Sequence, residues 1–169
     1  MKILETDRLI LCKLSIDDAA FILELLNEPS FLRFVGDKGV RTLDHARDYI
    51  LNGPIASYER HGFGLYLTKL KENGISIGIC GLLQRESLAD VDIGFALLPQ
   101  FWGSGYATEA AAAVLTHGRN ILGLDRIVAV TSPDNLASIN VLEKLGLRFE
   151  KMIKLSDDRP ESKLFVPAS

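Results

Sequence analysis

The sequence predicts an α+β domain with a mixed central sheet, and length, periodicity and element order lead to this fold class. The chain of 169 residues can bury one sizeable core, and no repeat or low-complexity linker divides it. Residues 1–169 are therefore expected to form a single domain. Apolar residues recur at helical spacing in some segments and occur in short β-rich runs in others. Antiparallel hairpins combined with one strand–helix–strand crossover are typical of an α+β domain.

Two helices are predicted in the first half of the chain, at residues 17–27 and, with an interruption, at residues 42–60. Each follows a hydroxyl side chain that can accept a hydrogen bond from the first helical turn. Proline interrupts the helical pattern because it lacks an N–H group and its ring clashes with the preceding turn. The expected caps are Ser15 and Thr42, and the expected breaks are Pro29 and Pro54.

The expected order is strand, two helices, three strands, helix, strand, helix and two strands. The three consecutive strands are predicted to form an antiparallel meander, because turn residues such as those at 72–74 separate them. The predicted strands are residues 8–14, 63–68, 76–83, 91–97, 126–131, 147–155 and 162–166, and the later helices are residues 105–122 and 137–145.

Composition argues against several classes of function. The formal net charge is −3 and neither sign forms a long block, so neither nucleic acid nor an anionic membrane is expected as a partner. The apolar runs are too short to span a bilayer and the N-terminus lacks a signal-peptide pattern, so a cytoplasmic location is expected. Cys12 and Cys80 are expected to be core thiols. His45, His61 and His117 have no metal-ligand spacing, so no metal is expected.

The most informative segment is residues 95–110, where a strand ends, two glycines follow and a helix begins. Gly103 and Gly105 allow unusual backbone dihedrals and expose N–H groups, and the helix N-terminus adds its dipole, so a pyrophosphate would fit there. An ordinary strand-to-helix turn is the alternative. A P-loop is excluded because no Lys follows the glycines. A dinucleotide fold is disfavoured because Thr108 stands where a small residue is required and Asp125 precedes the next strand.

Three motifs resemble those of the GNAT superfamily of acetyltransferases. The pattern Q-x-x-G-x-G at residues 100–105 resembles its cofactor signature. The pattern N-x-x-S at residues 135–138, followed by E-K-L-G at residues 143–146, resembles its second motif. The opening E-T-D-R-L at residues 5–9 resembles the RimJ/RimL branch, which includes ribosomal-protein N-terminal acetyltransferases. The family fold implied is a mixed, mostly antiparallel sheet of about seven strands, splayed between the fourth and fifth, with about four flanking helices.

The resemblance implies that acetyl-CoA is the cosubstrate and that a primary amine attacks it directly in a ternary complex. The pantetheine arm would enter the splay between the strands at residues 91–97 and 126–131. The main-chain N–H groups of residues 103–107, here called the glycine turn, would hold the pyrophosphate. Asn135 would bond the arm or the ribose side, although a helix cap is the alternative interpretation of this residue. The implied cofactor-binding residues are Phe95, Ala96, Leu97, Gln100, Gly103, Ser104, Gly105, Tyr106, Ala107, Asn135 and Ser138.

Two side chains are candidates for catalysis. Ser138 could give a proton to the departing thiolate, because Leu142 stands where many family members carry a Tyr; a plain first-turn helix serine is the alternative. Asp92 could receive the amine proton, although strand alternation alone does not say which face it occupies. Glu109 is explained by the helix dipole. A main-chain N–H near Phe95 or Ala96 would stabilise the oxyanion.

The acceptor stays open at this point, as either a protein N-terminal α-amine or a small-molecule amine. The acceptor site is expected to be shaped by the helices around residues 31–58 and by the loop at residues 156–161. The acidic loop at residues 156–161 could attract a cationic substrate or be a solvated charge cluster. A rival function is a non-catalytic module that binds or senses acyl-CoA. The protein is expected to be a monomer or a homodimer.

Overall fold

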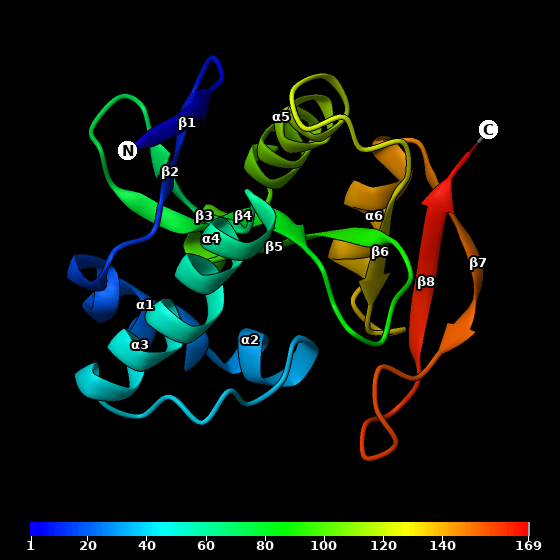
Figure 1. Ribbon diagram of the computed structural model, residues 1–169, viewed down its shortest axis with the longest axis horizontal. Helices are drawn as coiled ribbons and strands as arrows, with labels where there is room; N and C mark the ends of the chain where they lie inside the picture. Colours follow the sequence, from blue (N-terminus) through cyan, green and yellow to red (C-terminus); the bar gives the residue numbers. More distant parts are fainter. Residues whose placement is uncertain (169) are drawn as a thin grey trace.

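Eight strands form one mixed sheet in the computed structural model, which describes residues 1–168 (Figure 1). The strand order across the sheet is β1-β2-β3-β4-β5-β6-β8-β7. Neighbouring strands pair antiparallel except β5 and β6, which are parallel. The strands are β1 (Lys2–Glu5), β2 (Leu9–Lys13), β3 (Leu65–Leu70), β4 (Ser76–Leu83), β5 (Val91–Leu97), β6 (Ile127–Thr131), β7 (Leu147–Ile153) and β8 (Ser162–Pro167).

Helices cover both faces of this sheet. Figure 1 shows α1 to α4, in blue and cyan, gathered together and away from α5 and α6. Among residues 1–168, no helix is both long and apolar enough to cross a membrane. The helices are α1 (Ala19–Leu26), α2 (Pro29–Phe34), α3 (Leu43–Ile50), α4 (Ala56–His61), α5 (Tyr106–Asn120) and α6 (Leu136–Lys144), with short turns at Ile16–Asp18, Leu51–Ile55 and Pro99–Phe101.

The sheet separates two apolar clusters. On one face, Ile22 of α1 and Ile50 of α3 are fully buried against a cluster that includes Ile79 of β4. On the other face, the small residues of α5 let this helix lie close to β4 and β5, where Val114 packs in the cluster of Ile93. Burial of such side chains supplies most of the stabilisation of the fold. The two layers cover both faces of β5, the strand that carries the candidate site.

Most elements occur where the sequence predicts them. The meander of β3, β4 and β5 is antiparallel as expected. Ser15 accepts a hydrogen bond from the main-chain N–H of Asp17, and Thr42 accepts one from His45, so both predicted caps are confirmed. Cys80 is buried as a free thiol.

Three elements differ from the prediction, for physical reasons. Strand β1 was not predicted, and it is a short edge strand whose pairing with β2 is irregular. Pro29 ends the first helix but also begins α2, because proline is well tolerated at the first helical position. Pro54 does not stop the helical path; the chain passes through a π-helical turn at Leu51–Ile55, whose wider bonding pattern accommodates the missing N–H.

The predicted splay is present between β5 and β6. Their parallel pairing runs from Val91 opposite Ile127 to Ile93 opposite Ala129 and then stops. Beyond Ile93, β5 continues to Leu97 with a partner only on its β4 side. A gap lined by unpaired main chain therefore opens in the middle of the sheet.

Candidate active site

The free edge of β5 presents main-chain groups to this gap. The N–H of Leu98 donates to the carbonyl of Ile77 at 2.9 Å, so Leu98 points its N–H toward β4. Since main-chain groups alternate along a strand, those of Phe95 and Leu97 point the other way, into the gap. Trp102 Nε1 donates to the Leu97 carbonyl at 3.0 Å. The N–H and C=O of Phe95 lie on the edge where a ligand can complete their bonding.

The glycine turn adopts the conformation that an anion site requires. Gly103 and Gly105 have φ values of +80° and +82°, the left-handed region that favours glycine. Gly105 is the N-cap of α5, and the first main-chain bond of that helix runs from Glu109 N to the Gly105 carbonyl. The N–H groups of Tyr106 and Ala107 therefore have no partner within the helix. Together with the dipole of α5 they form an anion-binding surface.

The N-terminal segment holds this helix start in place. Thr6 Oγ1 donates to Glu109 Oε2 at 2.5 Å, the Arg8 N–H donates to the same oxygen at 3.0 Å, and Arg8 Nε donates to Oε1 at 2.7 Å. The Arg8 guanidinium also lies 4.4 Å from the ring centroid of Tyr106. Partial burial alone would raise the pKa of Glu109, but the hydrogen bonds from Thr6 and Arg8 lower it. Glu109 is thus more than a dipole partner, because it joins α5 to the turn between β1 and β2.

A first cavity of about 580 Å³ extends from the glycine turn along the gap to α6. That volume is typical of cofactor sites, and the cavity brings together the strand edge, the anion-binding turn and α6. Two of the expected cofactor residues, Gln100 and Ser104, do not line this cavity; both are exposed beside the glycine turn. The expected cofactor residues that do line it are Phe95, Ala96, Leu97, Gly103, Gly105, Tyr106, Ala107, Asn135 and Ser138.

Helix α2, which the sequence did not predict, lies with its C-cap residue beside the first cavity. Phe31, Phe34 and Val35 line the first cavity. No helix was expected at residues 29–34 because Pro29 was interpreted only as a break, although residues 31–58 were expected to shape the acceptor site. Trp102, also unpredicted, lines the cavity and bonds the strand end. The sequence signal that could have identified Trp102 is its position directly before the glycine pair.

A second cavity of about 250 Å³ meets the first at the splay. Because the two cavities share lining residues, a group in one can approach a group in the other. The shared lining residues are Phe31, Phe34, Val35, Phe95, Ala96, Asn135 and Ser138. A ligand in each cavity could therefore meet the other at this junction and react there.

Asn135 and Ser138 occupy this junction in defined roles. The Ser138 N–H donates to Asn135 Oδ1 at 3.3 Å, so Asn135 is the N-cap of α6. The cap interpretation of Asn135 is confirmed, and the amide nitrogen of its side chain is not used by this bond. The Ser138 hydroxyl is not the cap, and Ser138 lines both cavities. One turn later, the buried Leu142 lines the second cavity.

Asp92 lies on the face of β5 away from α5, which settles the question that strand alternation left open. It is 1% exposed, and Arg85 Nε contacts its two carboxylate oxygens at 3.1 and 3.2 Å. Burial raises the pKa of Asp92 to about 6, even though the charge and hydrogen bonds of Arg85 act to lower it. Arg85 lines the second cavity but Asp92 lines neither. Its role as proton acceptor stays a prediction.

Comparisons with known proteins agree with this geometry. Residues 8–148 match the family described as an acetyltransferase (GNAT) domain. An uncharacterized N-acetyltransferase of Bacillus subtilis, YoaA, is 32% identical over 154 residues, which are 90% of this chain and 86% of that protein. The acetyltransferase from Agrobacterium tumefaciens superimposes with a TM-score of 0.82 at 26% identity, covering 98% of this chain and 93% of that one.

The same fold occurs in RimL, a ribosomal alpha-N-protein acetyltransferase solved in complex with coenzyme A. The TM-score is 0.83 at 19% identity, and the alignment covers 99% of each chain. The glycine turn, the splayed strands and the first cavity fit acetyl-CoA, the cosubstrate of this fold. The chain therefore belongs to the GNAT family of acetyltransferases and is an acetyl-CoA-dependent acyltransferase.

Proposed function

We propose that this protein transfers the acetyl group of acetyl-CoA to a primary amine by direct attack within a ternary complex. The observation that carries the proposal is the junction of the two cavities at Phe95, Asn135 and Ser138, where β5 and β6 part. The first cavity contains the anion-binding turn, so it suits the cofactor. The second cavity opens onto the same residues from the other side and suits the amine. Holding both reactants at one junction supplies much of the rate enhancement of such a transfer.

The cofactor would be held largely by main chain. The N–H groups of residues 103 and 105–107, with the dipole of α5, would hold the pyrophosphate. The C=O of Phe95 and the N–H of Leu97 would bond the amides of the arm as a further strand would. The free amide nitrogen of Asn135 would bond the same arm. Bound in this way, acetyl-CoA supplies an activated acyl thioester at the junction.

The chain's own groups would then manage charge and protons. The Phe95 N–H would stabilise the oxyanion that forms when the amine attacks. The hydroxyl of Ser138 would give its proton to the departing thiolate, because it lines both cavities and Leu142 has no proton to give. Asp92 would accept the amine proton, and because its carboxylate lies buried against Arg85 the transfer needs a bridging water.

The test combines binding with turnover. Acetyl-CoA at about 100 times its Kd should raise the melting temperature by roughly 5 to 10 °C, from mass action in a protein of this size. Thiol release should then be followed over a panel of N-terminal peptides, aminoglycosides, polyamines and amino acids. Absence of both stabilisation at millimolar acetyl-CoA and thiol release would refute the proposal. Stabilisation with no release for any amine would instead support the non-catalytic module.

A further inference from the structure

The charged residues that line the second cavity are all cationic. They are Lys38, Arg85 and Arg159, and no Asp or Glu is among the lining residues. They come from the loops after α2, after β4 and after β7, which are far apart in the sequence. In the whole chain, acidic residues outnumber Lys and Arg by 22 to 19, so composition does not explain this concentration of positive charge.

The three side chains are close enough to repel one another. Desolvation, and then the positive charges of Arg85 and Arg159, lower the pKa of Lys38. Lys38 as a whole residue is exposed to solvent, so an anion can reach it. Like charges in a cavity cost free energy unless an opposite charge joins them. The cavity therefore favours an anion.

Among residues 1–168, only one of these cations has a carboxylate partner. Arg85 is paired through Nε with Asp92, which accounts for one positive charge. Arg159 donates to the neutral carbonyl of Val35 at 2.7 Å. In the part of the chain that the structure describes, neither Lys38 nor Arg159 has a carboxylate within ion-pair distance.

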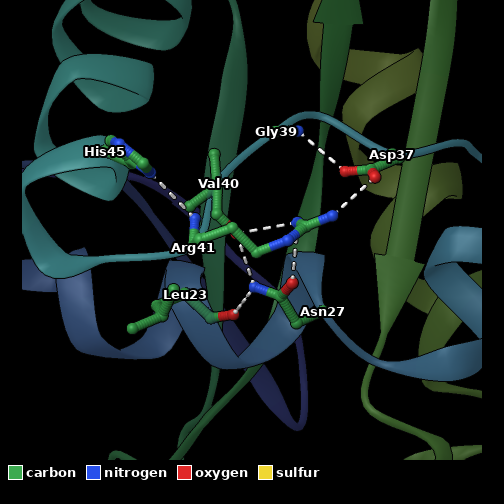
Figure 2. Close-up of polar contacts among 7 residues, drawn as sticks. All are labelled: Leu23, Asn27, Asp37, Gly39, Val40, Arg41 and His45. Carbon is green, nitrogen blue, oxygen red and sulfur yellow. Dashed lines mark hydrogen bonds and ion pairs between the residues drawn. The ribbon is translucent and has the colours of Figure 1, made fainter.

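Hydrogen bonds within the loop that carries Lys38 join the neighbouring acid, Asp37, to other residues. Figure 2 shows Asp37 accepting hydrogen bonds from the Gly39 N–H at 2.8 Å and from Arg41 at 2.5 Å. Arg41 also donates to the side-chain oxygen of Asn27 at the end of α1, at 3.1 Å. The same Asn27 donates to the main chain of the loop at 2.8 Å. These bonds fix the loop and pair Asp37 with Arg41 rather than with Lys38.

The acidic loop between β7 and β8 contributes a cation, Arg159, to the lining of the second cavity. Arg159 lines the cavity, whereas Asp157, Asp158 and Glu161 do not. Asp158 accepts a hydrogen bond from the Ser156 hydroxyl at 2.6 Å and is exposed. The geometry therefore favours the solvated-cluster interpretation of these acids over a site for a cationic substrate.

These cations are not needed for the cofactor. Gly103, Gly105 and the first turn of α5 line only the first cavity, so the phosphates of acetyl-CoA have their own site. We propose that the amine acceptor also carries an anionic group, a carboxylate or a phosphate, which Lys38, Arg85 and Arg159 bind in the second cavity. This inference rests on the proposed acetyl transfer and specifies the acceptor. The volume of about 250 Å³ suits a molecule of amino-acid size, with the Tyr49 hydroxyl available for a further bond.

The test uses matched amines that carry or lack the anion. Leucine is compared with leucinamide and 3-methylbutylamine, and O-phosphoethanolamine with ethanolamine, at saturating acetyl-CoA. The anion-bearing member of at least one pair should have a kcat/KM about tenfold higher or more, as expected for a charge-assisted hydrogen bond. The leucine set reports a carboxylate site and the ethanolamine pair a phosphate site.

Variants assign the preference to this cavity. Lys38→Gln and Arg159→Gln should each reduce the preference for the anion severalfold through KM, while Lys38→Arg retains it. Lys151→Gln removes one positive charge from an exposed position outside the cavity and serves as the control. Arg85 is left intact because its loss would leave Asp92 buried without a partner.

Binding supplies a second readout that does not need turnover. In the presence of CoA, 4-methylpentanoate should stabilise the protein against heat and 4-methylpentanamide should not. Equal kcat/KM within every pair, or a preference that survives both Gln variants, would overturn the inference. If acetyl-CoA binds but no amine is acetylated, equal effects of the acid and the amide would overturn it. Failure of acetyl-CoA to bind would instead refute the proposed function.

Discussion

Replacing Glu109 by Ala should destabilise the fold well beyond the effect of a lost helix-dipole contact. Glu109 accepts hydrogen bonds from Thr6 Oγ1, from the Arg8 N–H and from Arg8 Nε. A dipole contact alone is worth about 0.3 to 1 kcal/mol. The structure therefore predicts a larger loss, because the variant frees a partly buried hydroxyl and a main-chain donor at the same time.

The magnitude follows from the exposure of the partners. The side chains of Arg8 and Glu109 are 45% and 21% exposed, so solvent screens their ion pair to about 1 kcal/mol or less. The bonds from Thr6 Oγ1 and the Arg8 N–H add about 1 kcal/mol each, giving a total of roughly 2 to 3 kcal/mol. For a chain of this length that total lowers the melting temperature by roughly 5 to 10 °C.

Urea unfolding of a double-mutant cycle isolates the contact from other effects of the substitution. Thr6→Val and Glu109→Ala are measured singly and together, and the expected coupling is about 1 kcal/mol. Asp44→Ala is the control, because Asp44 lies in the first turn of α3 and its side chain is 89% exposed. Additive effects within about 0.5 kcal/mol, or a loss for Glu109→Ala no larger than for Asp44→Ala, would show that only the dipole matters.

Three further predictions concern cofactor binding, chemistry and pH. Gly105→Val should weaken CoA binding about tenfold or more, whereas Gly123→Val, also at positive φ but outside the cavities, should not; equal affinities would return the turn to an ordinary structural role. Ser138→Ala should lower turnover by about 10² with unchanged acetyl-CoA affinity, and full turnover under chemistry-limited conditions would remove Ser138 from the mechanism. Burial raises the pKa of Asp92 from 3.8 to about 6, so its contribution to stability is present below about pH 4 and is lost as the pH rises through about 6. The stability of Asp92→Asn relative to wild type should therefore rise by on the order of 3 kcal/mol between about pH 4 and pH 7 in urea unfolding, and a difference independent of pH would contradict the raised pKa.

The cofactor half of the site could be predicted from sequence because its signals are local. The glycine pair at Gly103 and Gly105 implies positive φ before a helix, and the structure has both. Asn135 was recognised as a cap candidate from its place after a turn, and it caps α6. Such features need only neighbouring residues, so short patterns identify them.

For the acceptor half, the sequence indicated only the segments at residues 31–58 and 156–161 and not the binding residues, because the site is built from contacts between distant segments. Lys38, Arg85 and Arg159 each look like a solvated loop charge in the sequence, and only the tertiary structure brings them to one cavity. Helix α2 was missed because Pro29 both ends one helix and begins the next. The partner of Glu109 was missed for the same reason, since Thr6 and Arg8 lie about a hundred positions away in sequence.

The cofactor half and the acceptor half of the site depend on different parts of the chain, so substitutions affect them differently. Main-chain groups at Phe95 and in the glycine turn can hold the cofactor with little help from side chains, so sheet topology and two glycines suffice for that task. Recognition of the acceptor depends on side chains from loops, where substitutions leave the sheet intact. A chain can therefore share the fold and cosubstrate of a relative while binding a different amine. The cations of the second cavity, rather than the overall likeness to other acetyltransferases, are the feature from which the acceptor should be sought.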